Sequence, residues 1–93
     1  MGTEPQRRTF RIVNRLGMHA RSSAAFVQTA SKFRSEIWVE RDTQRVNGKS
    51  IMGVLMLAAS KGTQITVEAI GEDAPAALDA LGALVDSGFG ESQ

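Results

Sequence analysis

The chain changes its hydrophobic period several times within 93 residues, and this pattern most narrowly limits the folds open to it. Phe10 and Ile12 alternate with polar neighbours as in a half-buried strand, and the same period returns near residues 37–39 and 65–69. Segments 19–32 and 74–87 instead show apolar residues at helical spacing. The first helix should bury a face that consists of Ala20, Ala24, Val27 and Ala30, with Phe26 and Phe33 beside it.

Turn and cap residues separate these periodic segments. Residues 41–44 predict a turn from the strand near 37–39 into a second, short strand that ends at Val46. Ser50 is suited to cap a short helix over Ile51–Leu57. Asp73 and Pro75 are typical N-cap and first-turn residues for the last helix.

The resulting element order, βαββαβα, predicts an α+β fold. We expect an open-faced β-sandwich: a four-stranded, mainly antiparallel sheet with three helices on one face. Trp38 is out of phase with Ile37 and Val39, so it should point to the open face. Residues 1–7 are interpreted as a flexible N-terminal tail, and residues 8–91 as the single domain that such a length allows.

Composition excludes several classes of site. The absence of cysteine removes disulfides, thiolate metal sites and thiol catalysis. The longest apolar run, Ile51–Ala59, is about half as long as a bilayer requires, and the N-terminus resembles neither a signal peptide nor, with Gln6, a myristoylation signal. The lack of cysteine fits a reducing compartment, and the apolar runs are too short for a membrane span. We expect a cytoplasmic monomer with no membrane contact, no bound nucleic acid, no metal and no cofactor.

Charge is distributed unevenly along the chain. Residues 1–49 hold ten Lys and Arg against four Asp and Glu, whereas residues 50–93 hold one against six. A basic half suits an anionic ligand or an acidic partner surface. The alternative is that an asymmetry of this size is simply common on small domains.

The single histidine, His19, stands at the predicted start of a helix. A neutral imidazole is a nucleophile near pH 7, and the N–H groups and dipole of a first helical turn favour a phosphate placed there. Arg21 adds a planar donor fork for phosphate oxygens, and Arg15 in the preceding loop adds charge. The alternative is an ordinary surface or capping histidine.

Three neighbours of this histidine support a functional interpretation. Gly17 permits an unusual backbone angle, Met18 offers an apolar anchor for the loop, and Ala20 keeps bulk away from the imidazole. With no other His or Cys in the chain, His19 has no competitor for covalent chemistry of this type.

The segment 17–27, which begins Gly17-Met18-His19-Ala20-Arg21, resembles the active-site segment of HPr, the histidine-containing phosphocarrier of the bacterial phosphoenolpyruvate-dependent phosphotransferase system. A second segment, Val46–Leu55, resembles the regulatory serine segment of the same family. The resemblance extends over about residues 9–91, and the family's open-faced β-sandwich agrees with the predicted element order.

The resemblance implies a role for each matching residue. His19 would accept phosphate on Nδ1 from enzyme I and pass it to an enzyme IIA domain, so the protein would be a carrier and not an enzyme. Arg21 would contact the phosphoryl group, and Ser50 would be the site of an HPr kinase/phosphorylase. The residues expected to support the phosphate are Gly17, Ala20, Ser22 and Arg15, and those expected to dock partners are Met18, Ile51, Met52 and Leu55.

Two of these positions carry alternatives. The family usually has proline where this chain has Ser22, and serine gives up that stiffness but supplies an N–H and a hydroxyl near the phosphate. Ser50 is suited to a purely structural N-cap, although a phosphate at a helix N-terminus is compatible with that role. On the short helix, Val54 and Leu57 should point inward, leaving the docking residues partly exposed.

Three other functions remain open alternatives at this point. An α+β module could bind RNA, but Trp38 is a single aromatic where stacking surfaces have two or three. A metal carrier would need more soft ligands than one histidine. A paralogue that serves a nitrogen-linked or metabolic regulatory relay would look the same as a carrier for sugar uptake.

Overall fold

The computed structural model describes residues 4–91. The chain forms β1 (Gln6–Arg11), α1 (Ala20–Ala30), β2 (Glu36–Arg41), β3 (Gln44–Asn47), α2 (Ile51–Met56), β4 (Gln64–Ile70), α3 (Ala74–Asp86) and a short 3-10 turn, η1 (Gly88–Gly90). None of the helices within this described part is long and apolar enough to cross a membrane.

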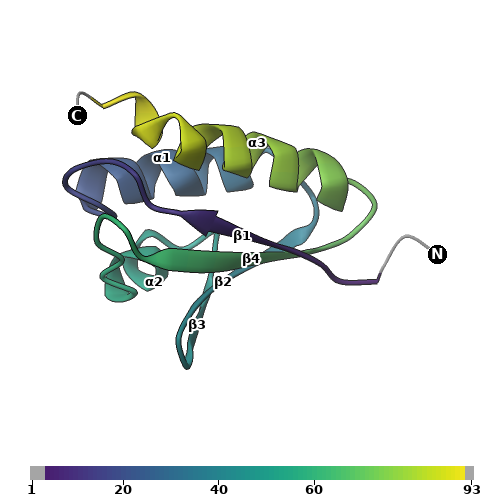
Figure 1. Cartoon of the computed structure of the whole chain (residues 1–93). Coiled ribbons are helices and arrows are strands. Elements are labelled where there is room, and N and C mark those ends of the chain that lie inside the picture. Colours follow the sequence, from purple (N-terminus) through teal and green to yellow (C-terminus); the bar gives the residue numbers. More distant parts are fainter. Residues whose placement is uncertain (1–3, 92–93) are drawn as a thin grey trace.

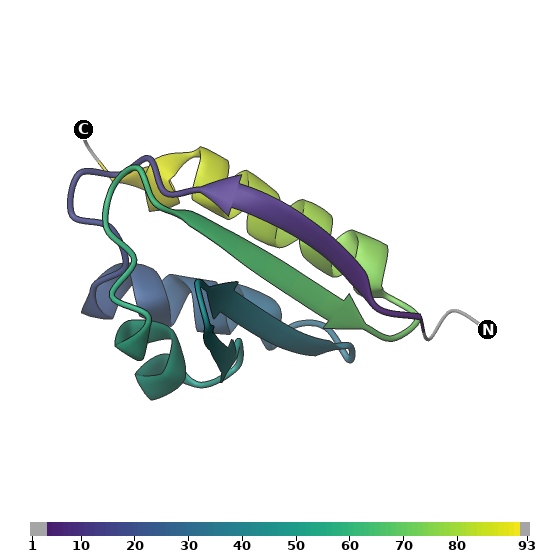
Figure 2. The same cartoon turned by 60° about the horizontal axis from the view of Figure 1, so that its bottom comes forward.

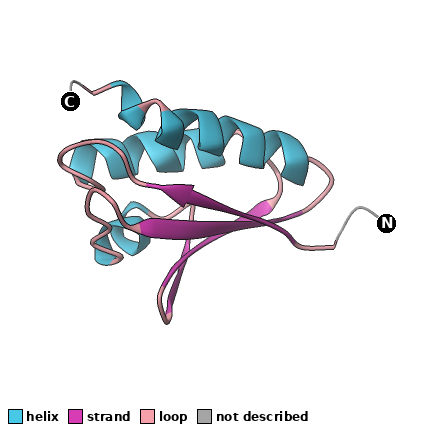
Figure 3. Ribbon diagram, viewed as in Figure 1, coloured by secondary structure: helices cyan, strands magenta, loops and turns pink. Residues whose placement is uncertain are grey.

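The four strands form one sheet in the order β1-β4-β2-β3, with every neighbouring pair antiparallel. Helices α1 and α3 lie side by side over one face of this sheet, and α2 packs against α1 and β3 (Figures 1 and 2). Figure 3 shows the opposite face of the sheet without a helical layer. The predicted α+β open-faced β-sandwich is therefore confirmed.

The core lies between the sheet and the helices. The register of β2 against β4 places Ile37 opposite Ala69 and Val39 opposite Val67, and all four side chains are buried, as alternation along a strand requires. The helices and loops complete the core with Ile12, Phe26, Val54, Leu57, Leu78, Leu81 and Val85.

The buried face of α1 differs from the predicted one. Ser22, Phe26 and Ala30, spaced four residues apart, are fully buried together with Ser23. Ala20 is exposed, and Ala24 and Val27 are only partly buried. The large Phe26 side chain determines which side of the helix turns inward, and the two serines accompany it because they share its face.

The first strand begins earlier than expected. Gln6 and Arg7, which the sequence analysis assigned to a flexible tail, pair with Ala69 and Glu68 of β4. Of the expected tail, residues 1–3 lie outside the described residues. The strand ends at Arg11. The next residue, Ile12, is buried in the core, and its N–H donates to the Thr63 carbonyl oxygen at 2.9 Å.

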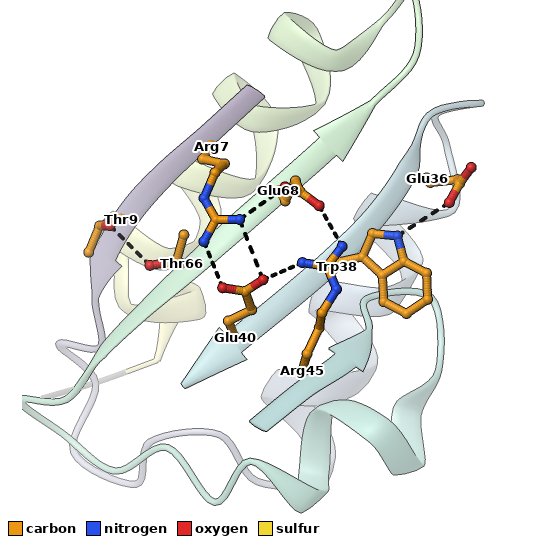
Figure 4. Close-up of polar contacts among 8 residues, drawn as sticks. All are labelled: Arg7, Thr9, Glu36, Trp38, Glu40, Arg45, Thr66 and Glu68. Carbon is orange, nitrogen blue, oxygen red and sulfur yellow. Dashed lines mark hydrogen bonds and ion pairs between the residues drawn. The ribbon is translucent and has the colours of Figure 1, made fainter. Parts of the chain in front are cut away.

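Four charged side chains, one from each strand, form a closed ion-pair network on the open face (Figure 4). Arg7 pairs with Glu40 at 2.7 Å and with Glu68 at 2.9 Å, and Arg45 pairs with the same two carboxylates. Arg45 also lies over the ring of Trp38, 4.9 Å from its centroid. Trp38 thus lies on the open face, as its phase predicted.

Asp73 occupies the predicted N-cap position of α3, but its side chain makes no cap hydrogen bond. Its carboxylate instead accepts from the backbone N–H groups of Arg34 (2.8 Å) and Ser35 (3.0 Å) and from the Ser35 hydroxyl. Asp73 therefore ties the loop before β2 to the start of α3, and these bonds hold the pKa of its carboxyl below the ordinary value.

Candidate functional site

His19 is the N-cap residue of α1. Its backbone is extended (φ −117°, ψ −172°), and its N–H donates to Ser22 Oγ at 2.8 Å. In return the backbone N–H of Arg21 donates to His19 Nδ1 at 3.2 Å. This reciprocal capping satisfies donors that a helix start would otherwise leave unpaired, and it directs Nδ1 to the positive end of the helix.

The two ring nitrogens of His19 have different partners. Nδ1 accepts a hydrogen bond, so it carries no proton, whereas Nε2 lies 2.7 Å from Glu91 Oε2. A carboxylate can only accept, so Nε2 must be the protonated nitrogen. The network thereby assigns the tautomer in which the lone pair is on Nδ1, and the side chain is 30% exposed.

Glu91 is itself held in place by a buried residue. Asn14 Nδ2 donates to Glu91 Oε1 at 3.0 Å and to the Gly17 carbonyl oxygen at 2.8 Å. The Asn14 hydrogen bond, followed by the contact with His19, holds the pKa of the Glu91 carboxyl below its ordinary value despite partial burial. An ionised carboxylate therefore faces Nε2 at neutral pH.

The loop before His19 requires glycine at position 17. Gly17 has φ of +67°, and a Cβ there would lie 2.5 Å from the Ala59 carbonyl oxygen and 2.8 Å from Ser60 Cα. The next residue, Met18, donates its N–H to the Ala59 oxygen at 2.8 Å. The unusual backbone angle predicted for Gly17 is present, and the close approach of the segment after α2 leaves no room for a side chain there.

Met18 anchors this loop to the core. Its side chain is only 7% exposed and belongs to the hydrophobic core. Little of the Met18 side chain is therefore open to a partner, and the docking role predicted for it stays a prediction.

The Ser22 hydroxyl has partners within the loop, while the support that Ser22 was predicted to give a phosphate stays a prediction. Its buried hydroxyl donates to the Gly17 carbonyl oxygen at 2.9 Å while accepting from the His19 N–H. The hydroxyl therefore fastens the loop to the helix start and is not directed at a phosphate outside. The other predicted supporting residues, Arg15 and Ala20, are exposed, as is Arg21. No side-chain hydrogen bond or ion pair of Arg15 or Arg21 is present within the described residues, although the charge of Arg21 helps, after Asn14 and His19, to lower the pKa of Glu91.

Ser50 is the N-cap of α2, as predicted. Its Oγ accepts from the Gly53 N–H at 3.1 Å. Val54 and Leu57 are buried and Leu55 is partly buried, which confirms the predicted inward side of this helix. The exposed large apolar side chains are Ile51, Met52, Met56 and, in the loop before His19, Leu16.

The sequence did not predict exposed apolar side chains at Leu16 and Met56. It also did not predict that Asn14 and Glu91 belong to the site of His19. Asn14 and Glu91 are 77 residues apart in the sequence, so no local pattern connects them. Within residues 4–91, no group of three or more His, Cys, Asp and Glu side chains could hold a metal ion.

Comparison with known proteins gives a consistent result. Residues 6–87 match the family described as the PTS HPr component phosphorylation site. The phosphocarrier protein HPr of Neisseria meningitidis is 52% identical over 87 residues, which is 94% of this chain and 98% of that protein.

Solved structures agree with the sequence comparison. The crystal structure of HPr-C-His from Thermoanaerobacter tengcongensis superimposes with a TM-score of 0.91 at 49% identity, covering 95% of this chain and 99% of that one. Crh of Bacillus subtilis, described as a dimer with a swapping domain, gives a TM-score of 0.73 at 46% identity, covering 80% of this chain and 85% of that one.

Proposed function

The chain belongs to the HPr family of phosphocarrier proteins, and we propose that it carries phosphate on Nδ1 of His19, which receives it from phospho-enzyme I and passes it to an enzyme IIA protein. The observation that carries this proposal is the state of the imidazole. Its lone pair is on Nδ1, at the N-terminus of an 11-residue helix, in a side chain that solvent reaches.

The groups around Nδ1 would stabilise a phosphoryl group during its transfer to or from His19. The positive end of α1 and the guanidinium of Arg21 would offset the negative charge that gathers on the phosphoryl oxygens, and Arg15 would add charge from the loop. Ala20, in the first turn, adds only a methyl group beside the imidazole.

Partner docking is proposed for the exposed apolar residues of α2. Ile51 and Met52 follow Ser50 directly, and Met52 is 69% exposed. Leu55 lies further along the same helix and is partly buried. A dianion on Ser50 Oγ would place charge beside this apolar surface, so phosphorylation by an HPr kinase/phosphorylase would change docking without unfolding the helix that Ser50 caps. We propose Ser50 as the regulatory site on this basis.

The open face argues against the nucleic-acid alternative. Arg7 and Arg45 are paired with Glu40 and Glu68, and Arg45 covers one side of the Trp38 ring. Arginines neutralised in this way, around a single aromatic ring, do not form the basic stacking surface that RNA requires. Service in a regulatory relay instead of sugar uptake is the alternative that the same site supports. We further propose a cytoplasmic location and a monomer that exchanges between partners.

The proposed function is tested by incubating the protein with enzyme I and phosphoenolpyruvate and measuring intact mass. We expect one phosphate, labile in acid and stable in base, as for a phosphoramidate. The His19→Ala variant should gain no mass. A variant that is still phosphorylated under these conditions would place the acceptor elsewhere.

A further inference from the structure

The segment after α3 bends sharply to bring Glu91 onto His19. Phe89 (φ +58°) and Gly90 (φ +70°) both adopt left-handed backbone angles, and the Glu91 N–H donates to the Gly88 carbonyl oxygen at 3.0 Å. Phe89 packs against the core and anchors the bend. An unfavourable backbone angle at a phenylalanine persists only where its surroundings enforce it, and such positions gather at functional sites.

Both oxygens of the Glu91 carboxylate are committed. Oε1 accepts from buried Asn14 and Oε2 contacts Nε2 of His19, and the Glu91 side chain is only 14% exposed. The carboxylate therefore approaches the imidazole from the side opposite to Nδ1. It does not stand where an incoming phosphoryl group would be placed.

We propose that Glu91 is a positioning residue for phosphoryl transfer, which holds the proton on Nε2 of His19 and so keeps the lone pair on Nδ1. The proposal rests on the proposed carrier function and adds a residue to it. Carboxylates that accept from one histidine nitrogen orient the ring and stabilise its charged form in other sites of this type.

The step balances without a further reactant. The Arg21 N–H releases Nδ1 of His19, and the Nδ1 lone pair attacks phosphorus. The Nδ1–P bond forms, and the donor's bond to phosphorus breaks with its electron pair remaining on the donor. The product ring bears phosphorus on Nδ1 and hydrogen on Nε2, so it is positively charged. The Glu91 carboxylate offsets that charge, and no proton has to leave. In the reverse direction the bond pair returns to Nδ1 and leaves a neutral ring.

The alternative is that Glu91 only fastens the end of the chain to Asn14. The two roles differ in what they predict for the Nε2 proton and for catalysis. A structural tie affects stability and leaves kcat unchanged, whereas a positioning residue that touches no partner lowers kcat with little effect on KM.

We would compare Glu91→Gln and Glu91→Ala with Glu72→Gln, which removes the same charge from an exposed side chain in the loop before α3. The ring protons of ¹⁵N-labelled protein would be followed by NMR at about pH 9, where an imidazole is neutral. Enzyme I-dependent phosphorylation would give kcat and KM, and thermal melts would control for folding.

We expect a slowly exchanging Nε2 proton in the wild type and in Glu72→Gln, and its loss in Glu91→Ala. We expect kcat to fall about ten- to a hundredfold in both Glu91 variants, the range for losing one hydrogen bond to a charged group, with KM changed less than about twofold. If the wild type is phosphorylated but kcat is unchanged in both Glu91 variants, the proposed role of Glu91 is refuted and the carrier function stands. The same holds if Glu91→Ala keeps the slowly exchanging Nε2 proton. A wild type that accepts no phosphate would overturn the proposed function, and the transfer role of Glu91 with it.

Discussion

Two neighbouring serines allow a direct measurement of what holds the His19 loop in place. Ser22 and Ser23 are both fully buried near the start of α1, and replacement by alanine removes the same atom from each. The Ser22 hydroxyl bonds to Gly17 and His19, whereas Ser23 Oγ has no hydrogen-bond partner within the described residues. Each variant is therefore a control for the other.

The contacts give the expected magnitudes. In Ser22→Ala the His19 N–H loses its acceptor, while the Gly17 carbonyl oxygen keeps the donor of Asn14. One buried unpaired donor costs about 1–3 kcal/mol, and the higher helix propensity of alanine offsets roughly 0.5 kcal/mol of this. We expect a net loss of about 1–2 kcal/mol. Ser23→Ala loses no bond and removes a desolvated hydroxyl, so it should be stabilised by about 0.5–1 kcal/mol.

Urea denaturation followed by circular dichroism would measure both changes, with equal m-values as the check on comparability. For a domain of this size each kcal/mol shifts Tm by about 4–8 °C, so the two variants should melt on opposite sides of the wild type. Equal losses of stability would refute the reasoning, because the hydrogen bonds of Ser22 would then contribute nothing beyond burial.

Four further predictions follow from the site and the sheet. Arg21→Ala should slow phosphorylation of His19 by at least about tenfold and leave Tm nearly unchanged, because its exposed guanidinium has no partner in the described structure; equal losses would indicate a structural role. Ser22→Pro should fold and accept phosphate, although with a loss of stability like that of Ser22→Ala, since a first helical turn accepts proline; an unfolded product would contradict this. Ser50→Asp should slow phosphorylation at low salt and recover partly as salt rises, with an unchanged circular dichroism spectrum; equal rates at every salt concentration would remove Ser50 from the docking surface. The hydrogen bond from Arg45, and then that from Arg7, lowers the pKa of Glu68. The stability that the ionised Glu68 contributes is therefore complete above its ordinary pKa of 4.5 and is lost as the pH falls through the lowered value. Glu68→Gln should weaken the fall of Tm at acid pH, and an unchanged fall would show that the network contributes little.

The sequence predicted those features that local physics determines. Alternation located β1, β2 and β4, and the turn signal at residues 41–44 located β3. Helical spacing located α1 and α3, and short polar side chains before an apolar run located the N-cap positions Ser50 and Asp73. The single histidine at a predicted helix start pointed to His19 and its neighbours, and the family resemblance added specific roles for them. These signals extend over a few residues, which is why they are readable without a structure.

What the sequence did not predict depends on contacts across the fold. Asp73 has the right position for a cap, but the backbone of Arg34 and Ser35 offers its carboxylate better-placed donors. Met18 was predicted to dock partners, but its side chain is only 7% exposed, which depends on core contacts that the local sequence does not reveal. Glu91 lies 72 residues from His19, so only the packing of the last segment reveals the pair.

The sheet order β1-β4-β2-β3 also has a consequence for how the molecule assembles and opens. During folding β2 and β3 can pair as a local hairpin. β1 can pair only after β4 has been brought to it, because the Thr9–Thr66 contact between these two strands closes a loop of 57 residues. The loop that carries His19 follows β1 directly and is pinned to Ala59, near the start of β4. We therefore expect the amide of Met18 to exchange with solvent deuterium together with those of β1, as one cooperative unit. The proposed phosphate acceptor would then be intact only while β1 and β4, which are far apart in the sequence, remain paired. On this proposal a partly opened chain would not act as a slow carrier.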